Sequence, residues 1–164
     1  MEEKKMEIEK IDKNMERNEN TNGGMNWHSP MQVPFRISGF PWILKEAAYR
    51  RLPKRPKGSI PESVDILADC TAGGQISFQT NSSNLVVKVQ LTGAANMYHM
   101  PATGQCGFDC YMGQPGKQRF CSTTRYDHRE AGYECLLFSD MGHEMKLITL
   151  NFPLYMGVRE VKVG

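Results

Sequence analysis

The sequence has no long apolar run. None of its hydrophobic stretches approaches the roughly 20 residues of a membrane span or the about 7–15 residues of a secretory leader core, and its N-terminus is charged throughout. We therefore expect no membrane contact and no cleaved leader. Five cysteines, an odd number in such a chain, favour reduced thiols packed as small core residues. These features predict a cytoplasmic protein.

Motifs that bind metals or phosphates are also missing. No Cys-x-x-Cys pair and no His-x-x-x-His pair occurs. Cys106 and Cys110 lie four residues apart, which on one strand separates them by about 13 Å, too far to share a zinc ion. Gly73-Gly74 lacks the Gly-x-x-x-x-Gly-Lys frame of a phosphate-binding loop. We expect neither a metal nor a cofactor.

Positive charge is too dilute to indicate a nucleic-acid-binding protein. The net charge is +2, with −2 on residues 1–24 and +4 on the remainder. The densest basic stretch, Lys45–Lys57, also contains Tyr49, and basic residues beside an aromatic ring can bind phosphates. Its prolines favour a solvated connection instead. Phosphate or nucleic-acid binding by this stretch is an alternative hypothesis, and we expect no nucleic-acid partner.

Two regions differ in pattern along the chain. Residues 1–24 are rich in Glu, Lys and Asn and predict a disordered tail or a frayed helix. Residues 25–164 contain about eight short stretches of alternating apolar residues separated by turn signals, which predicts an all-β antiparallel sandwich. The clearest strand is 85–91, whose odd-numbered residues should face the core. Near the start of this region, Val33, Phe35 and Ile37 predict another half-buried strand.

The chain is organised around residues 107–111, Gly-Phe-Asp-Cys-Tyr. In a strand, Phe108 and Cys110 would face the core while Asp109 and Tyr111 share the opposite face. An aspartate is poorly suited to a strand, so this carboxylate needs a partner.

Two explanations for Asp109 remain open. We favour a conformational lock, in which the carboxylate binds backbone amides or an arginine such as Arg50, Arg51 or Arg125. In the other, Asp109 and Tyr111 hold a sugar hydroxyl or dock a second domain.

The same five residues resemble the Gly-x-Asp-Leu-Tyr signature of a small domain at the N-terminus of SGNH-hydrolase-type (GDSL-like) esterases. Cys110 stands where leucine is usual, which keeps a small apolar group pointing inward. The resemblance extends over residues 25–164 and also rests on Trp27–Trp42, Tyr49–Pro53, Thr71–Ile76, Met100–Gly104 and Leu154–Val158. It implies a jelly-roll-like sandwich.

The resemblance also implies a function. The chain would be a non-catalytic accessory module that packs against a hydrolase domain, expected C-terminal to Gly164, and shapes the mouth of its active site. Contact with carbohydrate or an acylated substrate is a further expectation. Candidate contact residues are Trp42, Arg50, Arg51, His99, Asp109 and Tyr111.

A catalytic site is not expected in this chain. SGNH enzymes carry their serine in a Gly-Asp-Ser block, which is missing here, although Asp140-Met141-Gly142-His143 fits their Asp-x-x-His block. We interpret that short match as chance. The alternative is an autonomous small hydrolase that uses Asp140 and His143 with a serine such as Ser122 or Ser139.

Overall fold

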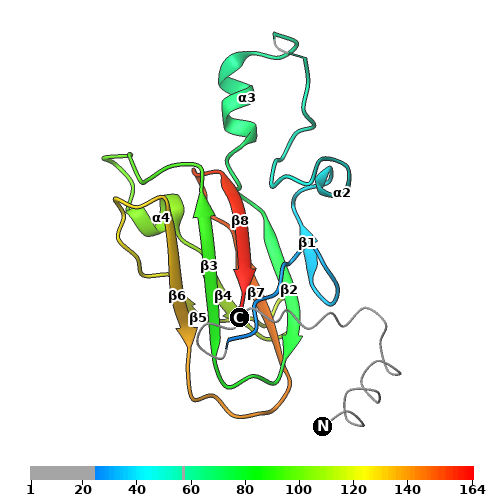
Figure 1. Cartoon of the computed structure of the whole chain (residues 1–164), viewed down its shortest axis with the longest axis vertical. Coiled ribbons are helices and arrows are strands. Elements are labelled where there is room, and N and C mark those ends of the chain that lie inside the picture. Colours follow the sequence, from blue (N-terminus) through cyan, green and yellow to red (C-terminus); the bar gives the residue numbers. More distant parts are fainter. Residues whose placement is uncertain (1–24, 57) are drawn as a thin grey trace, which may run out of the picture.

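The protein is a two-layered β-sandwich (Figure 1). The computed structural model describes residues 25–56 and 58–164, so the prediction of a disordered or helical tail over residues 1–24 lies outside the described residues. These described residues form eight strands: β1 Arg36–Ser38, β2 Gln75–Thr80, β3 Leu85–Leu91, β4 Asp109–Met112, β5 Arg119–Thr123, β6 Gly132–Phe138, β7 Lys146–Asn151 and β8 Val158–Val163.

The connections between the strands are those of a jelly roll. One sheet has the order β1-β2-β7-β4-β5 and the other β6-β3-β8, and every pair is antiparallel. From β2 onward, every connection except β4–β5 crosses from one sheet to the other. Strand alternation alone does not distinguish jelly-roll from immunoglobulin-like connections, and this strand order confirms the jelly roll that the family resemblance implies.

The core lies between the two sheets, where alternating residues of both layers meet. Leu85, Val87, Val89 and Leu91 are at most 2% exposed, which confirms the predicted inward face of β3. From the other sheet, β2 and β7 contribute inward residues such as Ile76 and Leu150, both fully buried. Strict alternation therefore leaves the intervening residues of β2 and β7 on the outer face of the five-stranded sheet.

The first strand is shorter than predicted. β1 begins at Arg36, and Val33, expected to face the core, is 78% exposed. Residues 29–35 instead form consecutive turns, with the Gln32 amide donating to the Ser29 carbonyl oxygen and the Phe35 amide to that of Gln32. Pro34 lies in this segment and has no N–H for a sheet ladder.

The described part of the chain contains three short helices: α2 Ile43–Glu46, α3 Glu62–Ala68 and α4 Ala102–Cys106. α3 starts directly after Pro61, a residue that suits a helix N-terminus, and it projects from one end of the sandwich (Figure 1). Within the described ranges, no helix is long and apolar enough to cross a membrane.

Candidate functional site

The first residue of the Gly-Phe-Asp-Cys-Tyr motif must be glycine because its surroundings leave no room for a side chain. Gly107 joins α4 to β4, and its amide donates to the Thr103 carbonyl oxygen at 2.8 Å. A Cβ atom at this position would lie 2.5 Å from that oxygen and 3.0 Å from Oγ1 of Thr124. Its φ of −85° is ordinary, so close packing rather than an unusual backbone conformation demands glycine.

The inward residues of the motif anchor it in the core. Phe108 is fully buried, and its ring centroid lies 4.7 Å from that of Phe152. Its amide donates to Oγ1 of Thr124 at 2.9 Å. Cys110 is also fully buried, and burial together with the neighbouring Cys121 thiol raises its pKa to about 12. A thiol that keeps its proton is a poor nucleophile, so Cys110 is a packing residue.

Asp109 and Tyr111 lie on the opposite, outer face, as the alternation predicted. The Tyr111 ring contacts Phe120 edge-on, with centroids 5.6 Å apart. In the described part of the chain, neither the Asp109 carboxylate nor the Tyr111 hydroxyl has a hydrogen-bond partner. The predicted lock is therefore wrong for these residues.

Arg50 shows why the lock fails. Its guanidinium binds the carboxylates of Asp65 and Asp69 instead of Asp109. Arg51 donates to the Leu67 carbonyl oxygen. Both arginines therefore hold the α3 segment, away from the motif.

The outer face of the five-stranded sheet is polar, and we call it the polar face. Strand register places its side chains in two rows across the sheet. The first row is Ser38, Gln75, Asn151, Asp109 and Thr123, and the second is Arg36, Ser77, Thr149, Tyr111 and Phe120. The motif residues Asp109 and Tyr111 thus extend a surface built by β1, β2 and β7.

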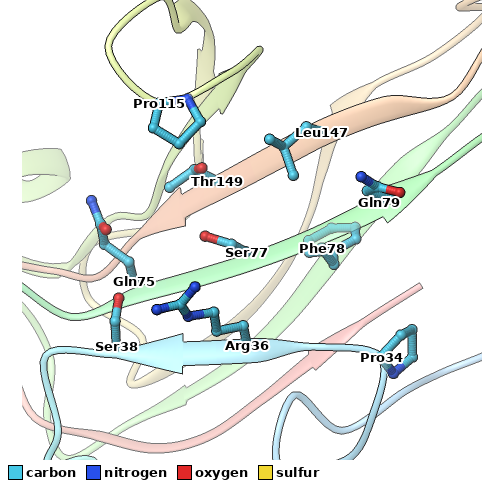
Figure 2. Close-up of a pocket in the computed structure, with 10 residues that line it drawn as sticks. All are labelled: Pro34, Arg36, Ser38, Gln75, Ser77, Phe78, Gln79, Pro115, Leu147 and Thr149. Atoms are coloured by element: carbon cyan, nitrogen blue, oxygen red, sulfur yellow. The ribbon is translucent and has the colours of Figure 1, made fainter.

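A groove of about 490 Å³ opens on the polar face (Figure 2). Its lining comprises Pro34, Arg36, Ser38, Gln75, Ser77, Phe78, Gln79, Pro115, Leu147 and Thr149. Hydrogen bonds order two sides of it, because Gln75 Nε2 donates to Asn151 Oδ1 at 2.9 Å and Gln118 Nε2 donates to Thr149 Oγ1 at 3.0 Å. Among the described lining residues, Arg36 alone carries a charge.

A second distinctive surface lies at one end of the sandwich. It comprises Trp42 and α2, residues 47–56 and 58–61, α3 and the β7–β8 loop, and we call it the helical end. Thr71, at the base of α3, joins these parts by donating its hydroxyl to the Pro153 and Met156 carbonyl oxygens at 3.1 and 2.9 Å. Arg50, 6% exposed, ties α3 to the preceding segment.

The helical end exposes many apolar side chains. On α3, Val64, Ile66 and Leu67 are 41–62% exposed, and Ala68 is its one buried residue. Large exposed side chains on the rest of this end are Trp42, Leu44, Leu52, Leu154 and Tyr155. Exposed apolar side chains collected in one region are a feature of many interaction surfaces.

Comparison with known families identifies this architecture. Residues 25–164 match the family model described as GxDLY: N-terminus of Esterase_SGNH_hydro-type. The chain belongs to this GxDLY family. The match confirms the resemblance drawn from residues 107–111, and the domain that this family describes stands at the N-terminus of SGNH-type esterases.

A solved structure shares the fold of the GxDLY domain. It is a crystal structure from Bacteroides ovatus ATCC 8483, named as a GDSL-like lipase, with a TM-score of 0.74 and 23% sequence identity. The alignment covers 84% of this chain and 40% of that one, so this chain spans less than half the length of the lipase. Comparison with curated proteins found no match.

The alternative of a small autonomous hydrolase has no geometric support in the described GxDLY domain. His143 is exposed in the β6–β7 turn, and no hydrogen bond joins it to another described residue. Ser139 is exposed as well, whereas the Ser122 hydroxyl is buried without a partner in the described part of the chain. Residues 25–56 and 58–164 also contain no cluster of His, Cys, Asp and Glu able to hold a metal ion.

The predicted contact residues of the GxDLY domain fall into separate groups. Trp42 and Arg51 lie at the helical end, where Arg50 is buried. Asp109 and Tyr111 lie on the polar face. His99 is exposed in the β3–α4 loop beside Tyr98, with ring centroids 5.0 Å apart, so the structure does not assemble one six-residue site.

Sequence reasoning missed the groove and the apolar face of α3. For the groove, the alternation in residues 75–79 and 147–151 assigns polar residues to one face of each strand. The sequence does not show that β2 pairs with β7, and this pairing is what places the two polar faces side by side. For α3, the sequence shows that Val64, Ile66 and Leu67 are apolar, and apolar residues by themselves favour burial rather than exposure.

Proposed function

We propose that this GxDLY domain is a non-catalytic accessory module of an SGNH-type esterase, and that it docks on the hydrolase domain through its helical end. The observation that carries the proposal is the exposure of the apolar residues of α3. Ala68 is the one buried residue among the seven of α3, so the helix contributes little to the core of the sandwich.

A complementary surface would gain from covering α3. Val64, Ile66 and Leu67 are about half exposed. Fully burying such a side chain is worth about 1.5–3 kcal/mol, so covering the exposed halves of these three would contribute about 3 kcal/mol in total. The position of α3 is set in advance by Arg50, which limits the entropy lost on docking.

Charge at the helical end defines the partner further. Arg51, Lys54 and Arg55 are exposed beside the apolar residues. Glu62, Asp65 and Asp69, on and directly after α3, are exposed there too, so the charges of this end are mixed. A hydrolase-domain surface that fits this end would combine an apolar centre with a polar rim whose acidic groups face Arg51, Lys54 and Arg55. Docked in this way, the module would shape the mouth of the active site, and its remaining surfaces would contact a carbohydrate or acylated substrate while the hydrolase domain performs the ester cleavage.

Hydrogen exchange tests the docking. The amides of α3 in the full esterase, with its hydrolase domain, should exchange more slowly than in this 164-residue chain. Ile66→Glu should remove the extra protection, because it places a charge where the contact is apolar. Leu136→Glu is the matched control, since Leu136 is similarly exposed on β6 of the three-stranded sheet. Equal α3 exchange rates in the two proteins would contradict the proposal.

An esterase assay tests the non-catalytic role. This chain alone should not hydrolyse p-nitrophenyl acetate above the buffer rate. Turnover that disappears on His143→Ala would show that the chain carries its own catalytic site.

We also propose that the protein resides in the cytoplasm, as its composition predicted. All five cysteines are free thiols in the structure, which suits a reducing compartment. Fractionation of cells that express the full esterase tests this, and recovery of the protein outside the cytoplasm would contradict it.

A further inference from the structure

We propose that the groove on the polar face binds an acidic oligosaccharide, with Arg36 holding the carboxylate of a uronate unit. This deepens the substrate contact in the proposed function by giving it a place and a chemical class. It does not depend on docking through the helical end, because the groove is formed by β1, β2, β7 and the β4–β5 loop.

The size and shape of the groove suit a small ligand. Its volume of about 490 Å³ falls within the range of about 300–1,000 Å³ that ligand sites occupy. Figure 2 shows Arg36 and Ser77 at its centre, Pro34 at one end and Pro115 on the far side. The two proline rings provide rigid apolar walls around a polar floor.

The polar groups in the groove match a ligand rich in hydroxyls. Ser38 and Ser77 supply hydroxyls, and Gln75 and Gln79 supply amides, so these side chains can both donate and accept hydrogen bonds. A sugar hydroxyl likewise donates and accepts. Gln75 already donates one hydrogen bond to Asn151, which orients its amide for a further contact.

Arg36 favours a ligand that carries negative charge. Its side chain is exposed and makes no ion pair within the described residues. The carboxylate on the same face, that of Asp109, belongs to β4, three strands away and therefore about 14 Å distant in the hydrogen-bonding direction. The guanidinium is thus not neutralised locally, and its planar fork fits a carboxylate with two parallel hydrogen bonds.

The row that contains Arg36 indicates a ligand longer than one sugar. It crosses the sheet through Ser77 and Thr149 to Tyr111 and Phe120, over four strand spacings or about 19 Å. Phe120 is 59% exposed and offers an apolar ring face for the C–H surface of a sugar. The Tyr111 hydroxyl, which has no hydrogen-bond partner among the described residues, lies along the same path. A chain of several units would therefore reach from the cation to the aromatic pair.

Calorimetry with defined oligosaccharides tests the proposal on this 164-residue chain. The probes are oligomers of four to six units of galacturonate, glucuronate and mannuronate, with neutral galactose oligomers of equal length. We expect at least one acidic oligomer to bind at least tenfold more tightly than the neutral one. The preference should weaken as salt screens the exposed guanidinium.

Variants assign the binding to the groove. Arg36→Gln should reduce the affinity for the acidic oligomer at least tenfold, and Arg36→Lys should restore part of it. Phe120→Ala should weaken long oligomers more than short ones. Arg159→Gln is the matched control, because Arg159 is an exposed arginine of β8 in the other sheet.

Three results would overturn the proposal. One is no binding of any acidic oligomer, and the second is an unchanged affinity in Arg36→Gln. The third is equal binding of inorganic sulfate, which would indicate a bare anion site without sugar recognition. A failure of this proposal can be told apart from a failure of the docking proposal. The docking proposal is tested by hydrogen exchange in α3, which Arg36→Gln should leave unchanged.

Discussion

Replacing Arg50 with methionine should release α3 without unfolding the sandwich. Arg50 donates through Nε to the Leu52 carbonyl oxygen and through Nη1 to that of Asp65, both at 3.1 Å. It also binds the carboxylates of Asp65 and Asp69. Methionine keeps the unbranched apolar stem and removes every one of these hydrogen bonds.

The expected magnitude follows from the exposure of the partners. The two bonds to carbonyl oxygens are worth about 1 kcal/mol each. The side chains of Asp65 and Asp69 are 53% and 61% exposed, so water can solvate them after the change and each ion pair contributes at most about 1 kcal/mol. The total is about 3 kcal/mol, equivalent to a roughly hundredfold increase in the opening equilibrium of the segment.

The loss should be local. Ala68 is the one buried residue of α3, whereas β3 pairs with both β6 and β8. Hydrogen exchange followed by mass spectrometry should therefore show faster exchange in residues 62–70 of Arg50→Met and unchanged exchange in residues 85–91. Arg129→Met is the control, because the Arg129–Asp127 ion pair lies on the surface and its loss should change neither segment.

Two outcomes would refute this reasoning. Unchanged exchange in α3 would mean that Arg50 does not hold the helix. Equal acceleration in α3 and β3 would mean that the helix and the sandwich unfold together, so that α3 is not a separately positioned docking element.

Three further changes have defined outcomes. Gly107→Ala should lower the unfolding free energy measured in urea by about 1–3 kcal/mol, because its Cβ would approach the Thr103 carbonyl oxygen to 2.5 Å. Gly93→Ala, with 3.8 Å to its nearest neighbour, should change the unfolding free energy little, and equal values for the two variants would contradict the steric requirement. Between pH 8 and 10 the unfolding free energy should fall by about 2 kcal/mol because of Cys110: the folded thiol, with its pKa raised to about 12, keeps a proton that the unfolded chain releases above about pH 8.5. Cys110→Leu should remove this part of the pH dependence of the unfolding free energy measured in urea, and an unchanged pH dependence would argue against this role of Cys110. Gln105→Ala should accelerate amide exchange in residues 94–100 by removing a buried amide that accepts two backbone hydrogen bonds from that loop, and normal exchange there would show that the loop is held otherwise.

Local patterns in the sequence determined the faces of the strands. Alternation in 85–91 and 107–111 assigned inward and outward residues correctly, because a strand repeats every two residues whatever its partner. The ordered motifs led to the GxDLY family and hence to the jelly roll. The same local reasoning failed at Val33, where turn hydrogen bonds next to Pro34 override the alternation.

Only the tertiary structure decided which outward residues lie together. Arg36, Ser77 and Tyr111 are far apart in the sequence, and the antiparallel register of β1, β2, β7 and β4 brings them into one row. Likewise, the predicted ion pair between Asp109 and Arg50 does not form, because Arg50 binds Asp65 and Asp69 at the helical end. Register and ion pairing depend on contacts between distant segments, whose energies are not encoded in any local window. The sequence alone therefore determined the layers and the family, and the pairing of distant strands created the groove.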